Sequence, residues 1–265
     1  MSEQYVTFGS KNIFLSNKIT PQDWLTGTQL VCDSTGDMIL WDFTGGEPTL
    51  YEHFPELLNL VKPYSIWAVT SNSLLRKQID KLDFERCCSW TASWHPGANK
   101  PIDQFIDNIK FVQSHKIYTS VTIVLHESTK LVIKDDLKRL QDAGFPTQIH
   151  LFLSEGWSLN DASQELKDVY EDLKQMNKAP AEGWSGSAPG LLNPRDCIAG
   201  YKSATVSSDG FVYSCYRHLM VENAPPIGRW GTWKPSNDLT RDCTWDCNFA
   251  CDLRNTIGTQ YYDAP

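Results

Sequence analysis

The sequence has no long apolar run and no surplus of basic residues. None of its apolar runs reaches about 18 residues, so we expect no membrane-spanning helix. Asp and Glu number 32 against 24 Lys and Arg, giving a net charge of -8, and general nucleic-acid binding needs a basic surface. Residues 1–4 show no basic-then-apolar signal pattern. These absences predict a cytoplasmic protein with no nucleic-acid or membrane partner.

Cysteine is scarce in the first three quarters of the chain and concentrated near its end. Only Cys32, Cys87 and Cys88 precede residue 197, and the other five of the eight cysteines lie at or after that position. A reducing compartment argues against disulfides, so the late cluster calls for a metal or redox explanation. We interpret Cys32 and the Cys87–Cys88 pair as packing residues, because adjacent cysteines on a strand point to opposite faces.

Apolar runs typical of buried strands alternate with amphipathic helical patterns along the first two thirds of the chain. Thr20 and Pro21 form a helix start before this series. We expect strands at 38–41, 66–70, 87–93, 121–125 and 149–153, and helices at 54–61, 74–82, 102–112, 133–143 and 162–176. Such a series predicts an α/β fold with parallel strands, as either a doubly wound sheet or an open barrel.

Two glycines, an acid and a proline follow the first expected strand: Gly45, Gly46, Glu47 and Pro48. The glycines permit backbone angles and close approaches that a side chain forbids. Glu47 is thereby expected at the carboxyl end of a parallel strand, where α/β proteins bind ligands. A carboxylate beside bare backbone suits the ammonium group of a small polar molecule. The four residues fit a plain strand-to-helix turn equally well.

The longer stretch 43–50, Phe-Thr-Gly-Gly-Glu-Pro-Thr-Leu, resembles the strand-two signature of radical S-adenosylmethionine (SAM) enzymes. The resemblance implies a partial (β/α) barrel of about six strands, with SAM held through its amino group at residues 45–48. The next strand ends in Ser71-Asn72, similar to a Thr-Asn pair of that family, and the resemblance implies ligand contacts from Ser71, Asn72 and Ser93. It places His95 near the substrate. From the residues alone, Ser71 and Asn72 equally suit a helix cap and His95 a structural hydrogen bond.

The linker 179–190, rich in Pro, Gly and Ser, predicts a boundary between a barrel domain, 1–178, and a cysteine-rich domain, 179–265. Beyond it, two short β runs flank the turn Asp209-Gly210, which predicts a hairpin. The five late cysteines offer more than the four thiolates that a cubane cluster needs, and four thiolates equally bind zinc. These candidate metal ligands are Cys197, Cys215, Cys243, Cys247 and Cys251.

The segment from Cys197 through Gly210 to Cys215 is similar to the opening of the auxiliary-cluster domains called SPASM or twitch. This resemblance implies one auxiliary [4Fe–4S] cluster. Cys243 with either Cys247 or Cys251 completes the set of four in our preferred interpretation.

Radical SAM enzymes hold their catalytic cluster on a C-x3-C-x2-C loop before the glycine loop, and here only Cys32 precedes it. Either the chain begins late, or it is a relative that lost this cluster, without which SAM is not cleaved reductively. We therefore carry two hypotheses. One is a radical SAM enzyme, supplied by an electron-donor protein, that modifies a peptide or small molecule through a 5′-deoxyadenosyl radical. The other is a non-catalytic iron–sulfur or zinc-binding relative that uses the barrel mouth as a binding surface.

Overall fold

The computed structural model describes residues 19–44, 46–97, 101–151, 163–177, 204–214 and 224–236. The chain divides into two compact units, Leu40–Ala179 and a second unit that combines Met1–Ile39 with Pro180–Pro265. The domain limits expected from the sequence, 1–178 and 179–265, remain a prediction. Within the described segments, no helix is long and apolar enough to cross a membrane.

A five-stranded sheet forms the first unit, in the order β1-β2-β3-β4-β5. The strands are β1 (Ile39–Phe43), β2 (Ser65–Ser71), β3 (Cys87–Trp94), β4 (Tyr118–Leu125) and β5 (Thr147–Leu151). Pairing is parallel from β2 to β5. The spatial order follows the chain order, without the reversal that defines a doubly wound sheet. Of the two α/β arrangements that the sequence left open, the strand order favours the barrel type.

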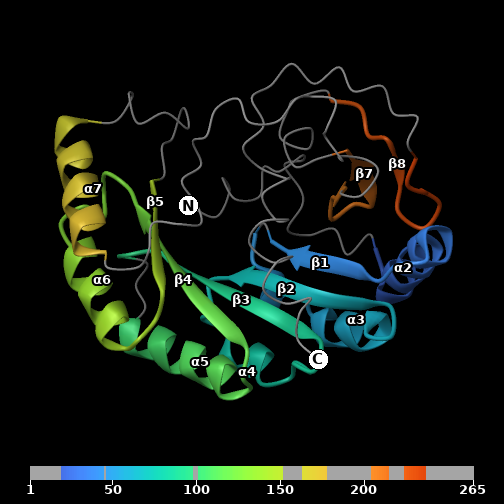
Figure 1. Ribbon diagram of the computed structural model, residues 1–265, viewed down its shortest axis with the longest axis horizontal. Coiled ribbons are helices and arrows are strands. Elements are labelled where there is room, and N and C mark those ends of the chain that lie inside the picture. Colours follow the sequence, from blue (N-terminus) through green and yellow to red (C-terminus); the bar gives the residue numbers. More distant parts are fainter. Residues whose placement is uncertain are drawn as a thin grey trace. The chain divides into compact units, whose positions relative to one another are not determined.

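Five helices accompany the sheet: α3 (Phe54–Val61), α4 (Arg76–Ile79), α5 (Ile102–Ser114), α6 (Ile133–Asp142) and α7 (Gln164–Met176). Figure 1 shows them along the convex side of the curved sheet. The ring of Trp94 on β3 packs 4.8 Å from Phe105 of α5, and Trp67 on β2 lies 6.4 Å from Phe54 of α3. The apolar core therefore lies between the sheet and these helices.

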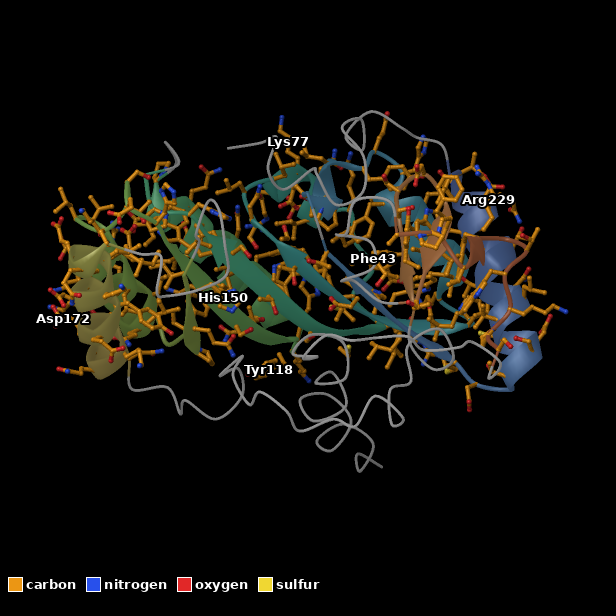
Figure 2. All side chains as sticks on the ribbon, turned by 90° about the horizontal axis from the view of Figure 1, so that it is seen from above. Phe43, Lys77, Tyr118, His150, Asp172 and Arg229 are labelled. Carbon is orange, nitrogen blue, oxygen red and sulfur yellow. The ribbon has the colours of Figure 1, made fainter. Side chains whose placement is uncertain are left out.

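The side chains on the other side of the sheet are mostly polar, because side chains alternate between faces along each strand. Thr70, Thr91 and Ser120 lie in register across β2, β3 and β4. Figure 2 shows His150 on the sheet, well apart from Asp172 on the outer helix α7. We call this side the concave face; its polar residues are Asp42, Thr70, Ser89, Thr91, Ser93, Tyr118, Ser120, Thr122, Gln148 and His150.

The second unit contains helix α2 (Pro21–Thr35) and a three-stranded antiparallel sheet of β6 (Thr205–Val206), β7 (Phe211–Tyr213) and β8 (Gly228–Arg229). The expected helix start is confirmed, since Thr20 and Asp23 form a capping box. The hairpin is confirmed as well, with Gly210 in its turn at φ +86°. The sequence analysis did not anticipate β8.

Most elements of the first unit differ from the expected bounds by one to three residues at an end; β4, for example, begins at Tyr118 where residue 121 was expected. Strand β5 begins at Thr147, two residues before the expected start, and residues 152 and 153 lie outside the described part of the chain. Helix α4 covers only Arg76–Ile79, whereas 74–82 was expected. The reason is a tight turn after β2, in which Ser73 takes a positive φ of 54° that no α-helix accommodates.

Candidate functional site

Glu47 lies in the loop that follows β1 and connects this loop to the end of β2 through hydrogen bonds. Its Oε1 accepts from the Thr49 backbone N at 3.1 Å, from Thr49 Oγ1 at 2.6 Å and from Ser71 Oγ at 2.7 Å. Its Oε2 accepts from the Asn72 backbone N at 2.6 Å. The carboxylate thereby caps the 3-10 helix η2 (Pro48–Leu50) and ties the end of β1 to the end of β2. We call Glu47, Thr49, Ser71, Asn72 and Ser73 the strand-end cluster.

Ser73 lies in the turn after β2 and holds it in place through buried hydrogen bonds. It is fully buried and in the left-handed region, a conformation that costs a non-glycine residue about 1–3 kcal/mol. Its Oγ accepts from Trp90 Nε1 at 2.9 Å, and its carbonyl oxygen accepts from Asn108 Nδ2 at 2.7 Å. Its backbone N donates to Ser71 Oγ at 2.9 Å. Buried hydrogen bonds from two other elements thus hold a strained turn in one conformation.

Asn72 makes a local hydrogen bond after β2, and its expected contact with a ligand stays a prediction. Its Oδ1 accepts from the Leu74 backbone N at 3.0 Å, as in a local cap. Its Nδ2 has no hydrogen-bond partner within the described residues, and the side chain is only half-buried. The amide therefore presents two N–H donors at the carboxyl edge of the sheet.

The remaining expected ligand contacts lie at the same edge or outside the described residues. Ser71 pairs with Ala92, so Ser93 lies one residue beyond that level on β3, with its side chain on the concave face. Gly46 has a φ of 56°, which favours glycine, and Pro48 begins η2. Gly45 lies outside the described residues.

Two histidines near the concave face are held in the neutral form. Burial lowers the pKa of His95, which follows β3, and the pKa of His150 on β5. A desolvated imidazole resists protonation because the charged form loses hydration. At neutral pH both side chains offer hydrogen bonds rather than positive charge.

Asp42 on β1 is a polar residue of the concave face that the sequence analysis did not single out. The neighbouring ring of Phe43 lies 5.1 Å from Phe54 of α3, on the convex side, so alternation directs Asp42 to the concave face. Its side chain is exposed, and desolvation by neighbouring protein atoms raises its pKa. Its charge also contributes to the raised pKa of Cys88. The signal was available: Asp42 is the single Asp or Glu in the five strands of this sheet.

The cysteines that the structure describes do not form a metal site. Cys32, Cys87 and Cys88 are free thiols, and the described segments contain no group of three potential metal ligands. Burial raises the pKa of all three thiols, which agrees with a packing role. The five candidate cluster ligands, Cys197, Cys215, Cys243, Cys247 and Cys251, lie outside the described residues, so the auxiliary cluster stays a prediction.

The fold and the strand-end cluster together define an α/β protein with a polar site at the carboxyl edge of a curved sheet. No model of a known protein family matches the sequence, and no curated protein matches it. Solved structures do resemble it. Native anSMEcpe with bound AdoMet (SAM) aligns with 80% of this chain and 69% of its own, at 17% identity and a TM-score of 0.55.

Streptococcus suis SuiB bound to S-adenosylmethionine aligns with 82% of this chain and 57% of its own, at 16% identity and a TM-score of 0.57. Native anSMEcpe with bound AdoMet and Cp18Cys peptide aligns with 80% of this chain and 70% of its own, at 16% identity and a TM-score of 0.51. At these identities the likeness shows the fold alone. The fold shared with these SAM-bound proteins is an α/β fold, and membership of the radical SAM superfamily stays a proposal.

Proposed function

We propose that this chain is a radical SAM protein that binds SAM at the strand-end cluster. The observation that carries the proposal is the Glu47 carboxylate, which joins the loop after β1 to the end of β2. The solved structures that share this fold include proteins with bound SAM. Beside Glu47, Asn72 Nδ2 has no partner within the described residues. The fixed carboxylate oxygens of Glu47 can accept from an ammonium group, and the nearby Asn72 amide can donate to a carboxylate. Together they suit an amino acid in its zwitterionic form.

The residues present fit the methionine part of SAM. A carboxylate has about four acceptor positions, and Glu47 Oε2 receives a single hydrogen bond from the described residues. It therefore retains capacity for the ammonium group. Asn72 Nδ2 suits the carboxylate of SAM, and Ser93 suits a ribose hydroxyl. Gly46 allows close backbone approach.

The chemistry comes from the cofactors: reductive cleavage of SAM at a [4Fe–4S] cluster supplies an organic radical. In the proposal, Cys197, Cys215, Cys243 and either Cys247 or Cys251 would bind one auxiliary [4Fe–4S] cluster. An electron-donor protein reduces the enzyme. The peptide bound to one neighbour favours a peptide substrate over a small molecule.

One sequence observation supports a second candidate, a non-catalytic relative. The eight cysteines contain no C-x3-C-x2-C triplet before the glycine loop. In this alternative the late cysteines bind iron–sulfur or zinc, and the barrel mouth serves as a binding surface. In-frame translation of DNA upstream of Met1 separates the two: a C-x3-C-x2-C triplet there supports the enzyme.

SAM binding tests the proposal directly. We expect isothermal titration calorimetry to give one SAM per chain, and N72A to weaken affinity about tenfold because two donors are lost. The matched control is N59A, the same change on the exposed surface of α3, which should leave affinity unchanged. No SAM binding by the wild-type chain, or equal affinity of the two variants, would contradict the proposal.

Metal content tests the cluster assignment. Anaerobic reconstitution with iron and sulfide should give about four iron per chain rather than eight, because the late cysteines ligate one cubane. C197A should lose this iron, and C32A should keep it, since Cys32 is a half-buried thiol on α2 and not one of the candidate ligands. Zinc without sulfide would remove the iron–sulfur assignment.

A further inference from the structure

Ser71, the last residue of β2, is buried, and its hydroxyl is engaged on both sides. The residue is 1% exposed. Its Oγ accepts from the Ser73 backbone N at 2.9 Å and donates to Glu47 Oε1 at 2.7 Å. A serine hydroxyl has a single proton, and Ser71 gives it to Glu47. A buried hydroxyl engaged in this way is poorly placed to contact a ligand directly.

The two oxygens of the Glu47 carboxylate are unequally supplied with donors. Oε1 accepts from the Thr49 backbone N, from Thr49 Oγ1 and from Ser71 Oγ. Among the described residues, Oε2 accepts only from the Asn72 backbone N. A carboxylate oxygen has about two acceptor positions. Oε1 is therefore fully used within the protein, and Oε2 is the oxygen with capacity left for a ligand.

The side chains that donate to Oε1 are buried and come from two separate segments. Thr49 and Ser71 are each 1% exposed, whereas Glu47 itself is half-buried. Thr49 belongs to η2, directly after Glu47, and Ser71 belongs to β2. The Ser71 hydroxyl is held in turn by the Ser73 N–H, and Ser73 Oγ accepts from the buried Trp90 indole. These contacts fix the orientation of the carboxylate independently of any ligand.

We propose that Ser71 and Thr49 are positioning residues of the SAM site: their hydroxyls fix Oε1 of Glu47, so that Oε2 alone receives the ammonium group of SAM. The inference rests on the proposed function and explains how the site distinguishes an amino acid from a plain carboxylic acid. A charge-assisted hydrogen bond depends on its geometry, so a carboxylate that is free to rotate binds an ammonium group less well. The resemblance implied a ligand contact from Ser71; in this proposal Ser71 acts through Glu47 instead.

The test compares two ligands on the full chain by isothermal titration calorimetry. They are SAM and its deamino analogue, the same sulfonium with a hydrogen atom in place of the ammonium group. The wild-type chain should bind SAM about tenfold more tightly, as one charge-assisted hydrogen bond allows. S71A should lower this ratio to about threefold or less, while its affinity for the deamino analogue stays within about twofold of wild type.

T49V provides an independent test, because valine keeps the branched shape of threonine and lacks the hydroxyl. It should lower the ratio as well, and it decides the outcome if S71A does not fold. The matched controls S114A and T26V make the same changes on exposed helix surfaces and should keep the full ratio. Thermal unfolding establishes that each variant is folded before it is titrated.

Equal weakening of both ligands in a folded variant would overturn the inference, because the residue would then act on the fold rather than on the ammonium group. A ratio that stays at the wild-type value in a folded variant would overturn the role of that residue. The inference and the proposed function also fail distinguishably. If the wild-type chain binds SAM and the deamino analogue equally, only the inference fails; if it binds no SAM, the proposed function fails and the inference falls with it.

Discussion

The backbone N–H of Asn72 donates to Glu47 Oε2 at 2.6 Å, across 25 residues of sequence. Together with the hydrogen bond from Ser71 Oγ, it fixes the end of β2 against the loop that follows β1. The edge that we assign to SAM is thus ordered by an internal hydrogen-bonded carboxylate. Glu47 has a structural role in addition to any contact with a ligand.

E47Q should destabilise the protein by about 1–3 kcal/mol. The glutamine amide must turn its NH2 group toward either the Thr49 N–H or the Asn72 N–H, and neither backbone donor can reorient. Urea denaturation measures the change in free energy of unfolding. The control E52Q alters an exposed side chain and should stay within about 0.5 kcal/mol. Equal stability of E47Q and wild type would show that these hydrogen bonds do not stabilise the fold.

N108A should destabilise the protein by about 1–3 kcal/mol and weaken SAM binding. The change leaves the buried Ser73 carbonyl without its donor, and the strained turn that carries Asn72 loses its support from α5. Denaturation and calorimetry measure the two effects. The control Q104A, exposed on the same helix, should change neither. Unchanged SAM affinity in a destabilised N108A would limit Asn108 to a packing role.

D42N should be more stable than wild type at pH 7. The pKa of Asp42 in the folded protein lies above its ordinary value of 3.8, because desolvation disfavours the charged form. Protonated Asp42 therefore favours folding, and this contribution is lost as pH rises through the folded-state pKa. The gain in D42N should be below about 1 kcal/mol, since the side chain retains solvent contact, and should vanish as pH approaches 3.8.

Denaturation at pH 7 and pH 4 tests this prediction, with D107N as the control of equal charge change. A D42N protein that is less stable than wild type at pH 7 would mean that the Asp42 carboxylate has a stabilising partner.

G27A should disrupt the packing of α2 in the second unit. A Cβ at position 27 would lie 2.3 Å from the indole of Trp230, whose ring packs 5.8 Å from that of Trp24. Overpacking of this kind costs about 1–3 kcal/mol, against which the better helix propensity of alanine recovers about 1 kcal/mol. Thermal unfolding followed by tryptophan fluorescence measures the loss. The neighbouring control T26A is exposed and should be neutral; equal stability of both variants would contradict the contact.

Much of the site was predictable because its members are short motifs at strand ends. The structure brings Gly46, Glu47, Pro48, Ser71 and Asn72 together, as residues 43–50 and the pattern of strands implied. Hydrophobic periodicity did not reveal Asp42, because a strand is recognised by its apolar residues and the pattern says nothing about a polar residue between them. The actual partners of Glu47 were equally hidden, because a hydrogen bond between residues far apart in the chain leaves no local signal.

By itself, the sequence determined the local elements. Thr20 and Pro21 start α2, Asp209-Gly210 turns the hairpin, and alternating apolar runs define most strands, because backbone sterics and side-chain periodicity act over a few residues. Only the tertiary structure decided the strand order, the polar concave face with Asp42, and the packing of Trp230 against Gly27. These depend on contacts between residues distant in the chain, whose free energy exists only once the chain has folded.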